Sequence, residues 1–264
     1  MLKCPKCDKK LNIVDKSYRC ENGHSYDIAK KGYVNLLMSQ VSKNRHHGDD
    51  KIMSLSRRDF LDKGHYLPLA RAVCEAVKGT KIADIGCGEC YYLSYIKDNI
   101  KDAECVGIDI SKEILEVASA RTKPRGIITA VASGAALPFA DESFDTLVSV
   151  FAPISDKEFY RVLKKDGIIL RVTPDVDHLY ELKEAVYDIP RKNDILDLSL
   201  DGFEIVKSER LCYTFSVDSH DAVNLFAMTP YYYKTAPSDR DKLLSVESIK
   251  ITADFDITIY QKLN

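Results

Sequence analysis

The sequence lacks two features that would associate the chain with a membrane. No stretch approaches the 18 consecutive apolar residues that a transmembrane helix needs. The first residues, Met1 to Pro5, contain neither the apolar stretch nor the small-residue cleavage site of a signal peptide. We therefore expect an intracellular, cytoplasmic protein with no membrane partner.

The eight cysteines do not form the framework of a secreted, disulfide-rich domain. Three of them crowd the first 20 residues and five are scattered along the rest of the chain. A chain of 264 residues, 45% of them apolar, can bury a substantial core without disulfides. Close-set cysteines in a cytosolic protein instead indicate metal binding.

The first 24 residues carry the spacing of a zinc site. Cys4 and Cys7 enclose two residues, twelve residues separate Cys7 from Cys20, and His24 follows after three more. Three thiolates and one imidazole are a standard ligand set for structural zinc. Residues 1–26 contain few apolar side chains, so metal binding would supply folding energy that a core cannot. The apolar floor of this segment would consist of Leu11, Ile13, Val14 and Tyr18.

The net charge of −2 conceals a basic N-terminal segment. Residues 1–58 carry 13 Lys+Arg against 6 Asp+Glu, or +7, whereas the other 206 residues carry 25 against 34, or −9. This asymmetry indicates contact with a polyanion, with a solvated basic surface as the alternative. We interpret residues 25–58 as a polar connector whose basic and aromatic side chains could contact RNA. His46 and His47 are a weaker candidate for a second metal site.

The centre of the chain has the pattern of a cofactor-binding turn. An apolar strand over residues 81–85 leads into the turn at 86–90, which contains Gly86 and Gly88, and then into a helix over 91–100. Such a turn lets the backbone approach a ligand, and the helix start offers N–H groups. A second apolar strand, residues 105–110, carries Asp109 near its end, where an acidic residue binds ribose hydroxyls.

The dinucleotide fingerprint is incomplete, because its third glycine position is Tyr91. Asp84, before the turn, is not needed to bind a pyrophosphate. It suits the cationic sulfonium region or the amino group of S-adenosylmethionine (SAM). The pattern therefore favours SAM over a dinucleotide.

The order of the following segments resembles class I SAM methyltransferases. Ala132-Ser133 and Leu137-Pro138-Phe139 correspond to the adenine-side loop, followed by a strand over 143–150. A helix over 159–163, a turn over 164–167 and a strand over 168–172 come next. Further expected segments are a helical stretch over 57–77 split near Gly64 and Pro68, a helix around 178–186, extended stretches over 203–206 and 211–217, and a last strand over 249–261.

Across nearly the whole chain, the motifs together resemble the 23S ribosomal RNA guanine-N1 methyltransferase family. The matching stretches are Cys4-Pro5-Lys6-Cys7, residues 24–29, residues 32–37, Gly48-Asp49, residues 57–61, residues 64–69, residues 84–89, Phe151-Ala152-Pro153 and His178-Leu179. The resemblance implies a mostly parallel, Rossmann-like α/β sheet of seven strands with an antiparallel edge. A small N-terminal zinc-binding module would precede it.

The resemblance also implies functional residues. Cys4, Cys7, Cys20 and His24 would ligate structural zinc. With the residues of the turn and loop included, the predicted SAM-binding residues are Tyr66, Asp84, Gly86, Cys87, Gly88, Glu89, Asp109, Leu137 and His178. Cys90 stands where the family leads us to expect glycine, either as a packing residue or as a reactive thiol.

The implied activity is methylation of N1 of a guanine in a hairpin loop of 23S rRNA, by a chain that the family suggests is a homodimer. The expected division is a zinc-binding RNA-recognition module over 1–36, a basic linker over 37–58 and a methyltransferase domain over 59–264. A methyltransferase for a small molecule and a non-enzymatic RNA-binding factor are the alternatives. No general base is identified: residues 151–153 offer no carboxylate, and Asp156 is the nearest. Residues 231–234 are an aromatic and basic cluster that could stack on RNA, or half-buried sheet residues.

Overall fold

The computed structural model describes residues 1–38 and 51–263. His46, His47, the Gly48-Asp49 motif and most of the predicted basic linker lie outside this range. Within the described residues, no helix combines the length and the apolar character that crossing a bilayer requires.

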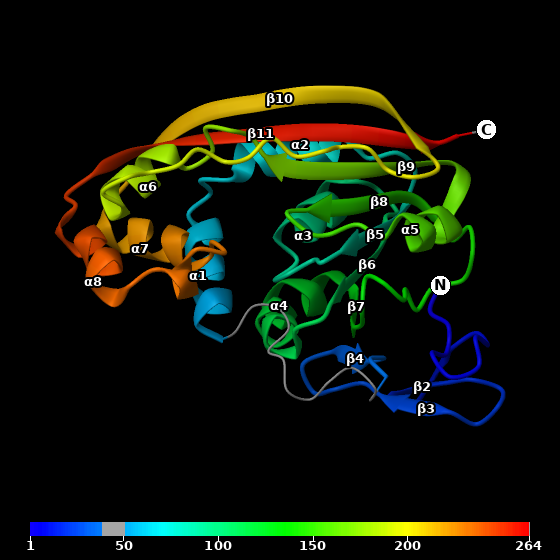
Figure 1. The fold of residues 1–264 in the computed structure, drawn as a ribbon. Helices are drawn as coiled ribbons and strands as arrows, with labels where there is room; N and C mark the ends of the chain where they lie inside the picture. Colours follow the sequence, from blue (N-terminus) through cyan, green and yellow to red (C-terminus); the bar gives the residue numbers. More distant parts are fainter. Residues whose placement is uncertain (39–50, 264) are drawn as a thin grey trace.

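An eight-stranded sheet forms the centre of the molecule, in the order β10-β11-β9-β8-β5-β6-β7-β4 (Figure 1). The β11 strand pairs antiparallel with both β10 and β9, and all other neighbours are parallel. The predicted mostly parallel sheet with an antiparallel edge is therefore confirmed, with β4 as an additional strand. The strands are β4 (Tyr33–Asn35), β5 (Lys81–Ile85), β6 (Glu104–Asp109), β7 (Ile128–Val131), β8 (Phe144–Val150), β9 (Leu163–Pro174), β10 (Phe203–Val217) and β11 (Ile249–Lys262).

Helices follow most of the strands, as the alternation of apolar segments predicts. The expected split of the helical stretch near Gly64 is confirmed, and Pro68 lies in the first turn of the second helix. The helices are α1 (Lys51–Asp62), α2 (Leu67–Ala76), α3 (Tyr91–Asn99), α4 (Lys112–Arg125), α5 (Asp156–Val162), α6 (Tyr180–Val186), α7 (Ser219–Ala227) and α8 (Pro237–Arg240), with short 3-10 helices at Tyr232–Lys234 and Asp241–Ser245.

Alternating side chains of the parallel strands build two hydrophobic cores, one on each face of the sheet. On β8, Val148 belongs to one core and Leu147 to the other. Residues from α1 to α4 fill the first core. The second core contains residues from α5 together with Leu2, Leu11 and Tyr18 of the N-terminal segment. That segment thus covers part of the second face of the sheet.

The N-terminal segment forms its own three-stranded sheet of β1 (Asn12–Val14), β2 (Ser17–Arg19) and β3 (Ser25–Asp27). Leu2 forms a β-bridge with Phe139 in the loop after β7. Leu11 and Tyr18 are buried, but Ile13 and Val14 are exposed. The predicted apolar floor is therefore wrong for the last two, because they lie on the short β1 strand that faces solvent.

Three other predictions of secondary structure were wrong. Residues 25–58 are not a mere connector, since they contain β3, β4 and the start of α1. Three-residue strands produce no periodic signal, and their stability comes from pairing with distant partners. The expected turn over 164–167 belongs to β9, whose first residue pairs with Phe144. The two extended stretches after residue 202 form one strand, β10, whose largely exposed residues at the sheet edge give no apolar alternation.

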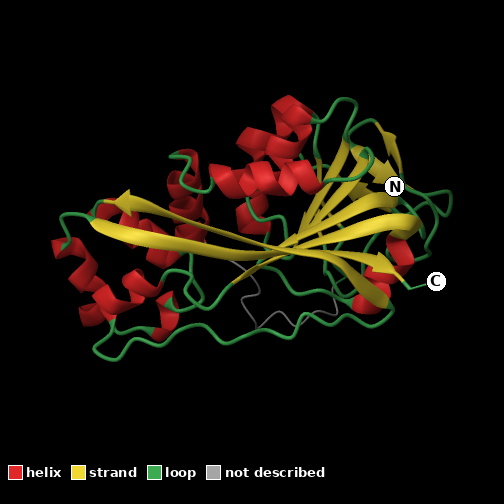
Figure 2. Cartoon of the chain, turned by 90° about the horizontal axis from the view of Figure 1, so that it is seen from above, coloured by secondary structure: helices red, strands yellow, loops and turns green. Residues whose placement is uncertain are grey.

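The antiparallel pair of β10 and β11 extends well past the rest of the sheet (Figure 2). It is paired from Phe203 with Lys262 to Val217 with Ile249, whereas β11 pairs with β9 only over 255–261. The helices α6, α7 and α8 gather near its far end (Figure 1). Lys63, which follows α1, forms an ion pair with Asp221 of α7. These elements build a helical wall beside the carboxyl ends of the parallel strands.

Truncation of Leu11 tests whether the N-terminal segment contributes to the second core. We expect Leu11→Ala to lower the free energy of unfolding by about 2–4 kcal/mol, because it removes a buried side chain. Ile13→Ala, two residues away on the exposed surface, should change it by less than about 0.5 kcal/mol. Urea denaturation of both variants measures the difference, and equal effects would contradict the packing described here.

Candidate cofactor and metal sites

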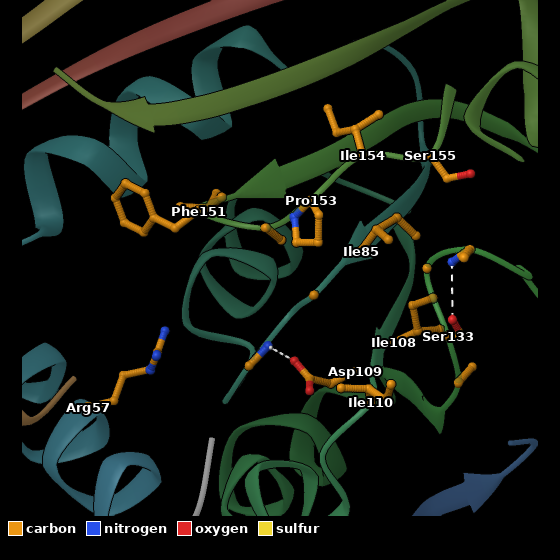
Figure 3. A pocket seen from close by; sticks show the side chains of 17 residues that line it. Arg57, Ile85, Ile108, Asp109, Ile110, Ser133, Phe151, Pro153, Ile154 and Ser155 are labelled. Carbon is orange, nitrogen blue, oxygen red and sulfur yellow. Dashed lines mark hydrogen bonds between the residues drawn. The ribbon is translucent and has the colours of Figure 1, made fainter. Parts of the chain in front are cut away.

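A cavity of about 410 Å³ lies at the carboxyl ends of β5, β6, β7 and β8. The chain runs from β5 to β6 and β7 on one side, and later returns through β8 and β9 on the other. Ligands of open parallel sheets bind where the direction of strand order reverses in this way. In Figure 3, Arg57 extends from α1 toward the cavity, across from Asp109 and Phe151.

The turn after β5 brings its backbone close to this cavity. Gly86 and Gly88 have φ angles of +79° and +54°, which glycine adopts without strain. A Cβ atom at Gly86 would lie 2.5 Å from the Cβ of Ala152, so only glycine fits. The N–H groups of Gly86 and Cys87 both donate to the carbonyl of Ile108, at 2.9 Å. The predicted glycine turn therefore leads from β5 into α3 and is hydrogen-bonded to the end of β6 at the cavity wall.

Asp109 is held rigidly at the end of β6. One carboxylate oxygen accepts the Gly88 N–H at 3.0 Å (Figure 3). The other accepts the Ser111 N–H at 2.8 Å. A carboxylate can accept more hydrogen bonds than these two, and the side chain lines the cavity. This arrangement fits the predicted binding of ribose hydroxyls.

A narrow extension of the cavity, about 30 Å³, is lined by Asp84, Cys87 and Glu89 together with the two glycines. Asp84 is 2% exposed, and burial together with the negative charge of Asp109 raises its pKa to about 8. A buried carboxyl group in this state gains most from a cationic ligand. The predicted interaction with the amino or sulfonium end of SAM therefore fits the site.

Glu89 is a buried carboxylate with a partner in the protein. Arg121 of α4 donates two hydrogen bonds to it, at 3.0 and 3.1 Å, and a third to Asp62. Burial raises the pKa of Glu89, although the arginine opposes this. The ion pair ties the cofactor turn to α4 and α1, so Glu89 positions the turn as well as lining the extension.

Cys90 occupies a position with left-handed backbone geometry, at φ +62°. Such a conformation explains why glycine would be expected there. The side chain is fully buried against Cys87 and Gly107. A hydrogen bond with Cys87 lowers the pKa of Cys90, but burial together with the negative charges of Asp84, Glu89 and Asp109 outweighs it, and the net shift is upward. A neutral, buried thiol favours the interpretation as a packing residue.

Three predicted cofactor residues line neither the main cavity nor its narrow extension. Leu137 is buried in the second core and its N–H donates to Glu158 at 2.6 Å, whereas the part of this loop that lines the cavity is Ala132 to Ala135. Because Leu137 does not line the cavity, the structure gives no support for its predicted contact with SAM. Tyr66 and His178 line a second, adjoining cavity of about 440 Å³. Their contact with SAM stays a prediction.

Sequence reasoning missed the second cavity and its arginines. Arg57, Phe151 and Ala152 line both large cavities, and Arg171 of β9 lines the second. The signal for Phe151 was its place after the fourth predicted strand. Nothing in the local sequence distinguishes Arg171 from any other polar residue on a strand.

His178 carries its proton on the nitrogen that faces Tyr66. The Nδ1 atom accepts the N–H of Asp254 at 3.2 Å, so Nε2 carries the hydrogen and lies 3.5 Å from the Tyr66 hydroxyl. Burial lowers the pKa of His178 to about 3, although the charge of Asp254 opposes this. The imidazole is therefore neutral and presents a donor to the second cavity.

The four predicted zinc ligands come together in the structure. The ligand atoms of Cys4, Cys7, Cys20 and His24 all lie within 4.8 Å of one another. Sγ of Cys7 is 3.7 Å from Sγ of Cys20, close to the edge of roughly 3.8 Å in a tetrahedron of zinc–sulfur bonds. The donor set and geometry fit structural zinc, with no position left for water.

The backbone and a neighbouring hydroxyl support this ligand set. Gly23, at φ +81°, makes the turn between Cys20 and His24, as predicted. The Tyr26 hydroxyl lies 3.2 Å from Sγ of Cys4 and donates to the sulfur once it is a thiolate ligand. Zinc would thus close the loop of residues 4–24 onto the small sheet.

Two family profiles match the chain. The family described as "RlmA, N-terminal", a zinc ribbon, matches residues 2–45. The family described as "Methyltransferase domain" matches residues 83–170. The first contains the metal cluster and the second contains the cofactor turn and Asp109.

Two curated relatives match almost the whole chain. "Putative 23S rRNA (guanine-N(1)-)-methyltransferase YxjB" of Bacillus subtilis is 34% identical, over 99% of this chain and 97% of its own. "23S rRNA (guanine(748)-N(1))-methyltransferase" of Streptomyces fradiae is 35% identical, over 90% and 88%. A solved structure described as "Conversion of a Disulfide Bond into a Thioacetal Group during Echinomycin Biosynthesis" has a TM-score of 0.51 at 15% identity, over 74% and 81%. It shares the fold alone.

The raised pKa of Asp84 makes cofactor binding depend on pH. Below about pH 8 the carboxyl is protonated, and a cationic ligand must displace that proton. We expect the affinity for SAM to fall by up to about tenfold per pH unit as the pH drops below about 8. Calorimetric titration between pH 6 and 9 measures this. Asp84→Asn should bind SAM more weakly than the wild type at pH 9, and its affinity should lose the pH dependence that Asp84 causes. If the affinities of the wild type and the variant change with pH in the same way, the assignment of Asp84 is contradicted.

Replacement of one predicted ligand tests the zinc site. Cys7→Ser should lose the bound zinc, since a hydroxyl is a poor substitute for a thiolate in this ligand set. Elemental analysis of the purified protein measures the metal content. Cys212→Ser, which changes an exposed cysteine outside the cluster, is the matched control and should retain zinc. Full zinc content in Cys7→Ser would refute the ligand assignment.

Proposed function

The chain belongs to the 23S rRNA (guanine-N1)-methyltransferase family, and we propose that it transfers the methyl group of SAM to N1 of a guanine in a hairpin loop of 23S rRNA. The observation that carries this proposal is the near full-length similarity, which spans the zinc segment as well as the methyltransferase fold. A small-molecule substrate does not require the zinc segment. Asp84, Gly86, Gly88 and Asp109 form an intact cofactor site, which argues against a non-enzymatic RNA-binding factor.

The chemistry of guanine supports a loop as the target. N1 carries a proton and is paired in a duplex, so the enzyme needs an unpaired base. Bases in RNA loops can be turned outward and stacked on aromatic side chains. SAM supplies the methyl group on a positively charged sulfonium, and the protein positions the acceptor nitrogen in line with it.

The N-terminal segment is the proposed RNA-recognition module. Its exposed basic side chains belong to Lys6, Lys9, Lys10, Lys16, Arg19, Lys30 and Lys31. Cations at this density bind the phosphates of a polyanion in a salt-dependent manner. We propose residues 1–36 as this module and 59–264 as the methyltransferase domain. Because β4 pairs with β7, the module would be fixed to the sheet rather than tethered.

We propose a cytoplasmic location, where 23S rRNA is found, and a homodimer in which two zinc modules form the walls of an RNA cleft. Light scattering on the purified protein measures the oligomeric state. A monomeric mass with full activity would remove the dimer from the proposal.

Methyl transfer to ribosomal RNA tests the reaction itself. The purified chain is incubated with labelled SAM and large-subunit RNA from a strain that lacks this gene, and the modified nucleoside is identified by mass spectrometry. We expect 1-methylguanosine in a hairpin loop. Gly86→Val would place a Cβ atom 2.5 Å from the Cβ of Ala152, so this variant should incorporate no label. It serves as the control for contaminating enzymes. Label in another nucleoside, or none in RNA despite SAM binding, would contradict the proposal.

A further inference from the structure

The second cavity adjoins the place where the cofactor's reactive end is expected. Arg57 and Phe151 line the main cavity, its narrow extension beside Asp84 and the second cavity. All three spaces therefore meet at these two side chains. A group held in the second cavity lies next to the cofactor site without entering it.

Phe151 forms the aromatic part of this boundary. Its φ angle is +57°, a strained conformation for a residue with a side chain, and such strain is often retained at functional sites. The ring is 40% exposed, and its centroid lies 6.1 Å from the ring centroid of His178 in a stacked orientation. An accessible aromatic face at this position suits a flat purine ring.

Arg171 supplies a positive charge inside the second cavity. It projects from β9, where it is paired with Ser149 of β8 and Thr258 of β11. Its Nε atom is buried and has no hydrogen-bond partner among the described residues. A buried donor without an acceptor is unfavourable, so the geometry calls for a ligand oxygen or nitrogen. Guanine presents O6 and N7, the pair of acceptors that arginine recognises best.

The other groups that face this space contain no base. The described residues that line the second cavity include no aspartate or glutamate. Tyr66, Tyr231 and His178 are neutral, with the histidine presenting its N–H, and Arg57 adds a second positive charge.

Two acidic groups near the lining residues have partners outside the cavity, and a third, Asp194, acts on Tyr231 and Lys183. Asp254, behind His178, accepts two hydrogen bonds from Arg210, at 2.7 Å each. Asp197 is exposed to solvent and accepts the Ser199 N–H. This hydrogen bond lowers the pKa of Asp197, and the charge of Arg171 contributes to the lowering. Among the described residues, the lining of the second cavity therefore carries two arginines and no carboxylate.

We propose that the second cavity receives the target guanine and that Arg171 binds O6 and stabilises the base in its N1-deprotonated form. This inference rests on the proposed function. The N1 proton passes to water, and the negative charge left on N1 and O6 is held by the guanidinium. The N1 lone pair then forms the bond to the methyl carbon, while the electrons of the broken carbon–sulfur bond return to sulfur. No carboxylate base is required, because a fixed cation lowers the energy of the anionic base.

The pH dependence of methylation distinguishes this role from a structural one. We expect Arg171→Met to lower the methylation rate at neutral pH by about 100-fold. The deficit should shrink as the pH rises, since alkali removes the N1 proton without help. Arg171→Lys should recover part of the rate. A deficit of the same size at every pH would overturn the assignment.

Binding without SAM provides a second readout. Guanosine binding, followed by saturation-transfer NMR, should strengthen with pH in the wild type and lose this dependence in Arg171→Met. Lys192→Met, which removes an exposed cation outside the cavity lining, is the matched control and should behave as the wild type. Unchanged SAM affinity in Arg171→Met shows that the variant is folded. Equal guanosine binding by the wild type and Arg171→Met at all pH values would also contradict the proposal.

The two proposals fail in distinguishable ways. If the wild type produces no 1-methylguanosine, the proposed function fails before any variant is compared. If the wild type produces it and the Arg171→Met profile runs parallel to that of the wild type, only the role of Arg171 fails.

Discussion

The reversal of strand order at β5 is the constraint on which both cavities depend. Parallel strands with helical crossovers place all their carboxyl ends on one edge of the sheet. At the reversal, the turn after β5 and the segment after β8 approach so closely that Gly86 has no room for a Cβ atom beside Ala152. The next residue back, Phe151, separates the two spaces. The close approach of the turn after β5 and the segment after β8 thus forms a cofactor site, an adjoining cavity and the boundary between them.

Apart from Arg57, which lines all three spaces, the ionisable groups on the two sides of Phe151 differ: carboxyl groups lie on one side and an arginine lies on the other. Asp84 and Asp109 lie on the cofactor side, where they favour a cation. Arg171 lies on the other side, where it favours an anion or a strong acceptor. A reaction that joins a positively charged methyl donor to a deprotonated base would use both fields. His178 is neutral because a charge on its buried imidazole would be unfavourable, so it adds no second positive charge beside Arg171.

The zinc segment is part of the fold rather than an appendage. Zinc bound to its cluster would close residues 4–24 into a loop. Leu11, inside this loop, and Leu2, just before it, belong to the second core. Leu2 pairs with Phe139, in the same loop whose first residues line the cofactor cavity. The backbone just before the ligand Cys4 therefore contacts the loop that continues from the cofactor cavity. The segment has little apolar surface of its own, so the second core and a bound metal would both stabilise it.

Local patterns in the sequence determined the features that depend on short spacings. The zinc ligands, the glycine turn and Asp109 at the end of β6 all follow from the geometry of a few consecutive residues, and the structure places them as predicted. Only the tertiary structure decided the rest. Leu137 lies in the second core rather than in the cavity lining. Tyr66 and His178 line the adjoining cavity, which Arg171 and Phe151 also line. These outcomes arise from strand pairing and packing between segments far apart in the chain, which leave no periodic signal in the residues themselves.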